Sequence, residues 1–310
     1  MIDMKRKTPI LSCINVFVIC VGARLFEYFV IRTEETFLSE NVIHKIFGIA
    51  LLFIVLRLFH LTWDEIGLKK NKIFLELGKG FLLGTACFFV AYSVECLILY
   101  LMNNNVHLEF YASGFSLTND MERQIGVGFI LLCIVFNLIN VWMEEGIFRG
   151  LFSSILKMKS FVHASFIIAF FFGIWHLAMP FRDYLDGNSS FANMLLMGIG
   201  YIILAGIMSI KWSLLYNLSD SLWMGMGDHL FNNVIVTNLL HVVSSGEADS
   251  LQIVRVMLGQ IMSFVIVCLY YKKQKRRMNT YEQTIEKHII DDCQRIRSSW
   301  WINSDFNSDS

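Results

Sequence analysis

The chain alternates between long apolar runs and short polar segments along most of its length. Eight mostly apolar runs are each long enough, at about 20 residues, to predict a transmembrane helix. They cover residues 9–31, 43–61, 78–102, 125–155, 161–179, 192–210, 213–241 and 251–271. The fourth and seventh runs are longer than a bilayer requires, so we expect tilt, protrusion or a break in each. The pattern predicts an all-α integral membrane protein with eight transmembrane helices around a polar intramembrane cavity.

Basic residues gather in those segments that eight spans would place on one side of the membrane. Because cytoplasmic loops carry an excess of Lys and Arg, both termini are predicted to be cytoplasmic. The basic groups are Lys5-Arg6-Lys7, the lysines between 69 and 79, Lys157 with Lys159, Lys211, and the cluster 272–277. The opposite side receives the mostly acidic or neutral segments 34–35, 103–122, 182–190 and 247–250. The first apolar run continues to Ile31 without a small-residue cleavage site, which favours a membrane helix over a signal peptide.

Composition agrees with a membrane protein. Of the 310 residues 55% are hydrophobic, the mean hydropathy is +0.54 and the formal net charge is zero. We expect the lipid bilayer as a partner and no nucleic acid, and the richness in Ile, Phe, Asn and Lys favours a prokaryotic plasma membrane. The seven cysteines contain no CxxC pair and are interpreted as core residues.

Two regions are expected. Residues 1–277 form one membrane domain, and 278–310 form a polar cytoplasmic tail. Within the tail, Ile285, Ile289, Ile290 and Ile296 suggest a short amphipathic helix, and residues 303–310 have a composition typical of disorder.

Three charged residues lie within the fourth apolar run. Charged side chains at membrane depth are costly and usually functional. Glu145 and Arg149 are four residues apart, so on a helix they share one face and can neutralise each other. Glu144 is rotated by about 100° from Glu145 and can face a different cavity. An unpaired buried carboxylate is suited to act as a general base toward water. The alternative is an ion-pair cluster that only fixes helix packing.

Two later runs each contain a histidine at depth. His176 ends the segment Phe172-Gly173-Ile174-Trp175-His176, and His229 precedes Asn233 by four residues, on one helical face. An asparagine there supplies the neutral donor that an oxyanion site requires. Each element alone is weak, because single polar residues in apolar helices commonly pack in the core.

Taken together, these residues predict peptide-bond hydrolysis inside the membrane. Glu144 would activate water, His176 and His229 would orient that water, and Asn233 would stabilise the oxyanion. No cofactor is strictly required, although Glu144, His176 and His229 could alternatively hold a divalent metal such as zinc, as in His₂Glu sites. From the adjoining loops, Glu144 is roughly 20 Å deep along its helix and the histidines roughly 25 Å. The substrate would be a peptide or a membrane protein.

These motifs resemble those of the CPBP family, the CAAX proteases and bacteriocin-processing enzymes also called Abi. The resemblance covers about residues 60–270 and consists of a Glu-Glu-x-x-x-Arg, a Phe-x-x-x-His and a His-x-x-x-Asn motif. They correspond to Glu144, Glu145 and Arg149, then Phe172 and His176, then His229 and Asn233; the segment 63–68 is similar as well.

The resemblance implies an eight-helix intramembrane endopeptidase, either glutamate-dependent or a metalloenzyme. It implies that Glu144 activates water, while Glu145 and Arg149 form a structural pair and Phe172 supports the site. CAAX-type C-terminal processing is implied for eukaryotic members. In a bacterium, peptide maturation or bacteriocin self-immunity is the better expectation.

Other classes fit the sequence less well. It contains no His-Glu dipeptide of a zinc protease, and Gly114-Phe115-Ser116 is followed by Leu117, not the glycine of a rhomboid. Residues 225–228 read Gly-Met-Gly-Asp, the GxGD of presenilin-type aspartic proteases, but no Tyr-Asp pair occurs in the chain. A non-proteolytic membrane scaffold or regulator remains an alternative. A proton-coupled transporter is another, and its path would include Arg24, Glu27 and Glu95.

Overall fold

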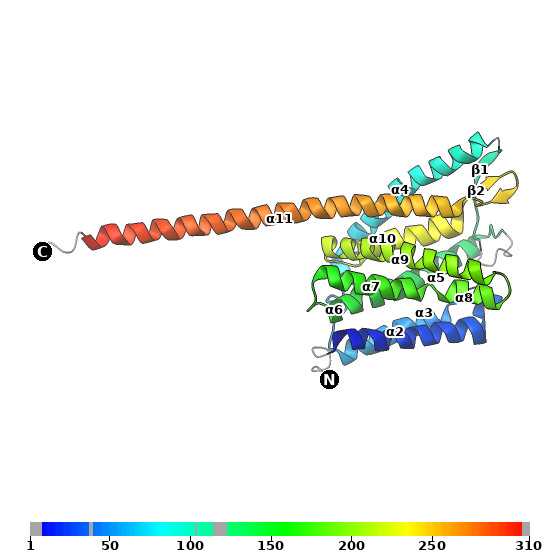
Figure 1. Cartoon of the computed structure of the whole chain (residues 1–310), viewed down its shortest axis with the longest axis horizontal. Coiled ribbons are helices and arrows are strands. Elements are labelled where there is room, and N and C mark those ends of the chain that lie inside the picture. Colours follow the sequence, from blue (N-terminus) through cyan, green and yellow to red (C-terminus); the bar gives the residue numbers. More distant parts are fainter. Residues whose placement is uncertain (1–7, 37–39, 103, 114–122, 306–310) are drawn as a thin grey trace. The chain divides into compact units, whose positions relative to one another are not determined.

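The protein is predominantly helical (Figure 1). A computed structural model describes residues 8–36, 40–102, 104–113 and 123–305, and describes side chains as far as Tyr281. The α-helices are α2 (Pro9–Phe26), α3 (Ile43–Leu58), α4 (Ile73–Leu101), α5 (Val127–Glu144), α6 (Ser153–Ile155), α7 (Phe161–Trp175), α8 (Ala178–Leu185), α9 (Phe191–Ser219), α10 (Trp223–Phe231) and α11 (Gln252–Asp305). Two short 3₁₀ turns, η2 (Thr33–Glu35) and η3 (Lys70–Lys72), precede α3 and α4.

Within the described residues, three helices contain π-helical segments: η1 (Glu27–Ile31), η4 (Glu145–Phe152) and η5 (Asn232–Leu239). The segment η4 continues α5 directly from Glu144, and η5 continues α10 directly from Phe231. Wider π-helical turns are rare in proteins, and those that occur are often found at functional sites. Two of the predicted motifs therefore lie at junctions where the helical geometry changes.

Six helical segments in the described residues are long and apolar enough to cross a membrane. They are Pro9–Glu35, Lys70–Leu101, Val127–Ile155, Phe161–Leu185, Phe191–Ser219 and Gln252–Tyr281. The other two predicted spans are also helical but shorter: α3 has 16 residues, and α10 with η5 covers 223–239. The chain is an integral membrane protein, and the number of eight spans stays a prediction.

One predicted boundary is wrong. The sixth and seventh spans were expected to meet near Lys211, but α9 continues to Ser219 and the turn lies at 220–222. Lys211 is fully buried in α9 and cannot serve as a loop charge. The lysine is retained inside the helix because the carboxylate of Asp228, on α10, lies 2.5 Å from its ammonium.

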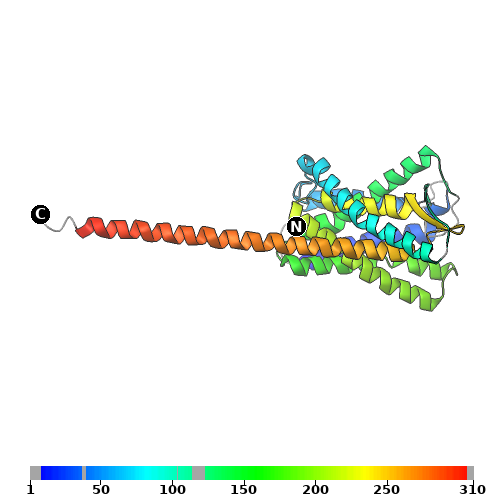
Figure 2. The same cartoon turned by 90° about the horizontal axis from the view of Figure 1, so that it is seen from above.

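The structure also contains a small antiparallel sheet that the all-α prediction did not include. Its strands are β1 (Val106–Phe110), β2 (Leu240–Ser244) and β3 (Glu247–Ala248), in the order β1-β2-β3. Val106 pairs with Ser244 and Phe110 with Leu240. The sheet lies at one end of the helical bundle (Figures 1 and 2). It joins two loops that the topology prediction places on the same side of the membrane.

Contacts between the other loops follow the same alternation. Lys69 pairs with Asp220, and the Leu222 amide donates to the Gly67 carbonyl at 2.9 Å. On the side opposite these loops in the predicted topology, Arg32 pairs with Asp186 at 2.7 Å. Loops predicted to share a side are therefore in contact, whereas the cytoplasmic location of the termini stays a prediction.

Helices α4 and α10 pack with their backbones in contact, which positions the second motif histidine. A Cβ atom on Gly80 would lie 2.7 Å from the Asp228 amide nitrogen, and one on Gly227 would meet the Leu77 backbone. Gly84 faces the ring of Phe231 in the same way. The Gly80-x-x-x-Gly84 pattern therefore permits the close packing of these two helices.

The chain divides into two compact units, residues 1–265 and 266–310, and α11 contributes to both. The second unit is helical as far as Asp305, so the expected amphipathic helix is part of α11 and not a separate element. Residues 303–305, expected to be disordered, are helical, and 306–310 lie outside the described residues.

Candidate active site

The acidic pair lies at the junction of α5 and η4, with both carboxylates buried. Arg149 donates to Glu145 from Nε to Oε2 at 2.7 Å and from Nη2 to Oε1. The Arg149 guanidinium also lies over the ring of Phe172, 4.2 Å from its centroid. Glu145 is therefore bound to its cation by two parallel hydrogen bonds, the geometry in which Arg–carboxylate pairs are strongest.

Glu144 faces other partners. The sequence suggested an unpaired carboxylate, but the structure gives it a hydrogen-bond donor. The indole Nε1 of Trp175 donates to its Oε1 at 2.9 Å. Its Oε2 lies 3.5 Å from Nε2 of His229. The carboxylate also interacts electrostatically with His176 and Arg24. Neighbouring carboxylates in the sequence thus have different environments: Glu145 is bound to a permanent cation, whereas Glu144 accepts from a neutral donor and faces an imidazole.

His229 links the two carboxylates. Its Nδ1 lies 2.8 Å from Oε1 of Glu145. Because a carboxylate paired with an arginine can only accept, Nδ1 carries the proton, and Nε2 faces Glu144. The indole of Trp212 stacks on the imidazole, with centroids 4.0 Å apart and planes inclined by 14°. The ring is therefore fixed by a hydrogen bond at one edge and by an aromatic plane on one face.

His176 ends α7 and is partly buried. Its Nδ1 lies 2.8 Å from the carbonyl oxygen of Phe172, so Nδ1 donates and Nε2 is left as an acceptor. The Phe172 ring touches His176 edge-on, with centroids 4.6 Å apart, and is also an edge neighbour of His229. Phe172 thus contacts both histidines and stacks against Arg149.

Asn233 lies one turn beyond His229, in the first turn of η5, and is partly buried. Its Oδ1 accepts from Nδ2 of Asn232 at 3.1 Å. Among the described residues, no acceptor is bonded to the Asn233 amide nitrogen. The oxyanion-donor role stays a prediction, and the free N–H group is the chemical property that this role needs.

The Asp of the GxGD sequence does not belong to an aspartic dyad in the described part of the chain. Asp228 accepts from the buried Lys211 at 2.5 Å and from Nε1 of Trp212 at 2.8 Å. Since Trp212 stacks on His229, Asp228 orients that histidine through the indole. Its charge is neutralised by the lysine, so a structural role accounts for the motif.

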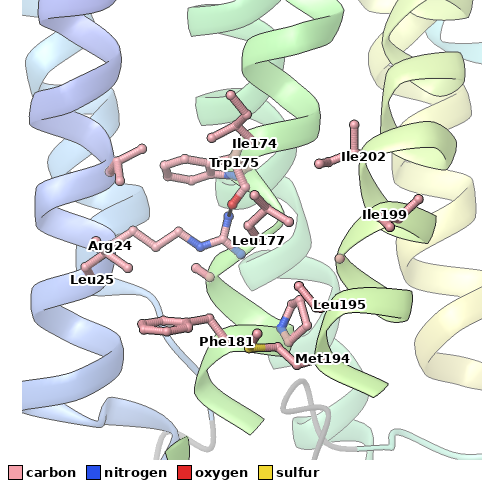
Figure 3. A pocket seen from close by; sticks show the side chains of 14 residues that line it. Arg24, Leu25, Ile174, Trp175, Leu177, Phe181, Met194, Leu195, Ile199 and Ile202 are labelled. Carbon is pink, nitrogen blue, oxygen red and sulfur yellow. Dashed lines mark hydrogen bonds between the residues drawn. The ribbon is translucent and has the colours of Figure 1, made fainter. Parts of the chain in front are cut away.

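A cavity of about 470 Å³ adjoins the site (Figure 3). It lies between α2, α7, α8 and α9 and is lined almost wholly by apolar side chains. The exception is Arg24, which donates to the Trp175 carbonyl at 2.7 Å and lies 4.3 Å from the centroid of that indole. Trp175 therefore borders the cavity and at the same time holds Glu144.

The charged residues of the transporter alternative have separate partners. Glu27 is bound to His44, whose backbone and ring nitrogens lie 2.5 and 2.6 Å from Oε2. Glu95 pairs with Arg255 at 2.7 Å, and Arg255 also binds Asp249. Arg24 is bonded to the Trp175 carbonyl instead of to Glu27.

The metal alternative can be tested on the donor set. Glu144 and His229 face each other, and His176 offers Nε2, which is the chemistry of a His₂Glu site. Within the described residues, however, no three His, Cys, Asp or Glu side chains come together as metal ligands would. In this arrangement these side chains do not form a set of metal ligands.

Sequence reasoning missed the two tryptophans and the buried lysine. Trp175 precedes His176 directly, and Trp212 follows Lys211, so both neighbour residues that had been noted. Aromatic residues are ordinary in membrane helices, and only the direction of each indole N–H distinguishes them. The lysine had been assigned to a loop because its counter-ion is on another helix.

Comparison with known proteins supports the family resemblance. The model of the Rce1-like family, described as type II CAAX prenyl endopeptidase Rce1-like, matches residues 126–235. No curated protein and no solved structure matches the chain. The matched segment contains all seven predicted site residues, from Glu144 to Asn233. Residues 126–235 are thus similar to the Rce1-like family, which confirms the resemblance to CPBP intramembrane proteases over this segment.

Proposed function

We propose that the protein is an intramembrane endopeptidase in which Glu144 activates water to hydrolyse a peptide bond. The observation that carries the proposal is the facing pair of Glu144 Oε2 and His229 Nε2, 3.5 Å apart, beside a Glu145 that accepts three hydrogen bonds from Arg149 and His229. Both oxygens of Glu145 accept hydrogen bonds from charged or histidine donors, whereas Glu144 accepts from the neutral Trp175 indole at Oε1. The family match to type II CAAX endopeptidases supports the reaction class.

The proposed reaction follows from the donor and acceptor character of each group. A water between Glu144 and His229 donates one O–H to each of them, which turns its lone pairs toward an incoming carbonyl carbon. As the water oxygen attacks that carbon, its proton passes to Glu144. The N–H group of Asn233 stabilises the oxyanion. Glu144 then returns the proton to the amide nitrogen, the C–N bond breaks, and the carboxylate is regenerated.

The substrate is proposed to be a hydrophobic peptide or a membrane-protein segment. The apolar cavity beside Trp175 would accept its non-polar side chains, since only Arg24 contributes charge to the lining. Peptide maturation or bacteriocin self-immunity fits such a substrate, and CAAX-type processing at a C-terminus would fit as well. We propose no bound metal for this cycle.

The proposal is tested by comparing peptide termini in membranes and medium of cells that express the wild type or Glu144→Gln. The glutamine keeps the size of the side chain and an oxygen for the Trp175 N–H, but it cannot accept a proton. The control is Glu76→Gln, which neutralises a buried carboxylate in the first turn of α4.

Termini produced by the wild type and by Glu76→Gln, and absent with Glu144→Gln, would support the proposal and identify the substrate. Identical termini in all three strains would refute proteolysis. If the cellular phenotype also persisted in Glu144→Gln, the scaffold alternative would replace it.

A further inference from the structure

Lys211 lies at the start of a chain of hydrogen-bonded side chains that ends at the candidate oxyanion donor. Its ammonium is fully buried and makes three contacts: Asp228 Oδ2 at 2.5 Å, Gln260 Oε1 at 2.6 Å and Ser263 Oγ at 3.0 Å. An ammonium group has three N–H donors and accepts nothing. All three donors are used, so every group around Lys211 must present an acceptor to it.

This requirement fixes the direction of the amides that follow. Gln260 turns its oxygen to Lys211, so its Nε2 points to Oδ1 of Asn232, 2.8 Å away. Asn232 therefore turns its Nδ2 to Oδ1 of Asn233, at 3.1 Å. Reversing any one of these amides would place two donors or two acceptors face to face. The oxygen and the nitrogen of a side-chain amide are similar in size, so shape alone does not fix which way the amide points. Here the direction is fixed by Lys211, which requires an acceptor.

The direction has a chemical consequence at the last amide. With its oxygen turned to Asn232, Asn233 directs its N–H donors away from that contact. If the chain ran in the opposite direction, Asn233 would present its carbonyl oxygen, which repels an oxyanion. An oxyanion site requires donors that are oriented before the reaction begins.

We propose that Lys211, Gln260 and Asn232 are positioning residues that hold the Asn233 amide with its N–H group toward the scissile carbonyl oxygen. The inference rests on the proposed peptide hydrolysis, and it extends the functional site to α11, beyond the segment that matches the family. None of the three residues touches the reacting atoms. Each acts through the next amide in the chain.

The test uses two substitutions at Gln260. Gln260→Glu preserves the shape and the contact with Lys211 but replaces the N–H donor by an acceptor. Asn232 would then turn its Nδ2 to the new carboxylate, and Asn233 would turn in response and present oxygen to the substrate. Gln260→Met interrupts the chain without imposing the reverse direction. Ser213→Ala, which removes a buried hydroxyl from α9 outside this chain, is the control.

The probe is a synthetic peptide that spans a cleavage site found to depend on Glu144, and kcat and KM are measured for each purified variant. We expect Gln260→Glu to lower kcat by about 100-fold, as for the loss of one oxyanion donor, with KM unchanged. Gln260→Met should lower kcat by less than about tenfold, because Asn233 can still adopt the productive direction.

A purely structural role predicts the opposite order, since the glutamate can still bind Lys211 and the methionine cannot. Equal kcat values for Gln260→Glu and the wild type, or a greater loss with Gln260→Met, would overturn the inference and leave the proposed function intact. Absence of any Glu144-dependent cleavage would overturn both. Should Gln260→Glu fail to fold, Asn232→Asp reverses the same chain one link later and carries the same expectation.

Discussion

The buried ion pair of Glu145 and Arg149 allows a quantitative prediction about stability. Both side chains are essentially inaccessible, and Arg149 provides two of the three hydrogen bonds to the carboxylate, His229 the third. Arg149→Met removes the cation and leaves Glu145 buried with one partner. Breaking a buried pair in this way costs about 3–5 kcal/mol of unfolding free energy.

The double variant Glu145→Gln/Arg149→Met should be less destabilised than Arg149→Met alone. Both lose the stacking of the guanidinium on Phe172, worth about 1 kcal/mol. In the double variant no charge is left unpaired, and the glutamine oxygen still accepts from His229. We therefore expect a total cost of about 2 kcal/mol or less for the double variant.

The measurement is the unfolding free energy of purified protein in mixed micelles, with increasing fractions of denaturing detergent. Arg57→Met, which removes an exposed arginine, is the control and should change the free energy by less than about 0.5 kcal/mol. A double variant as unstable as Arg149→Met, or more so, would show that the unpaired charge is not the cause, and our account of the pair would be wrong.

Three further predictions concern other parts of the molecule. Gly80→Ala should cost about 1–3 kcal/mol by forcing α4 from α10, whereas Gly78→Ala, which has open space around it, should be neutral or stabilising in the same assay. Ala178→Phe should fill part of the apolar cavity and raise KM about tenfold or more with kcat unchanged, and an unaltered KM would separate the cavity from substrate binding. Burial raises the pKa of Asp249, but the hydrogen bonds and charges of His241 and Arg255 lower it by more, so its pKa lies below the ordinary value. The ionised carboxylate therefore stabilises the fold above about pH 4, and this contribution is lost as the pH falls through the lowered pKa. Asp249→Asn should accordingly be less stable than the wild type at neutral pH by about 2 kcal/mol, and the difference should shrink in acid; a constant difference would contradict the assignment.

The helices could be predicted from the sequence because a bilayer leaves few alternatives for an apolar run of that length. Backbone groups in hydrocarbon must be bonded within the segment, which helices achieve. The sheet was missed although Val106–Phe110 alternates apolar and polar residues, because its partner strand lies more than 130 residues later. Local pattern can suggest a strand, but it cannot show which segment will pair with it.

The predicted site residues could be found because each is a polar group in an apolar run. Their arrangement could not be found, because it depends on contacts between helices. Lys211 is the clearest case: its hydrophilic character suggested a loop, whereas its three partners come from α10 and α11. Trp175 and Trp212 are a second case, since a tryptophan that donates to a carboxylate has the same sequence signature as one that only packs.

The distribution of charge explains why two adjacent carboxylates can have different functions. Glu145 forms an ion pair with Arg149, and Asp228 forms one with Lys211. A proton on either carboxylate would leave a buried cation without its counter-ion. Glu144 is held by the neutral indole of Trp175 and faces an imidazole, so taking up a proton strands no cation bonded to it. A rotation of about 100° between consecutive helix positions is enough to separate the two environments. The pair of glutamates therefore combines a fixed anion, which orients His229, with a carboxylate that is chemically free to take a proton from water.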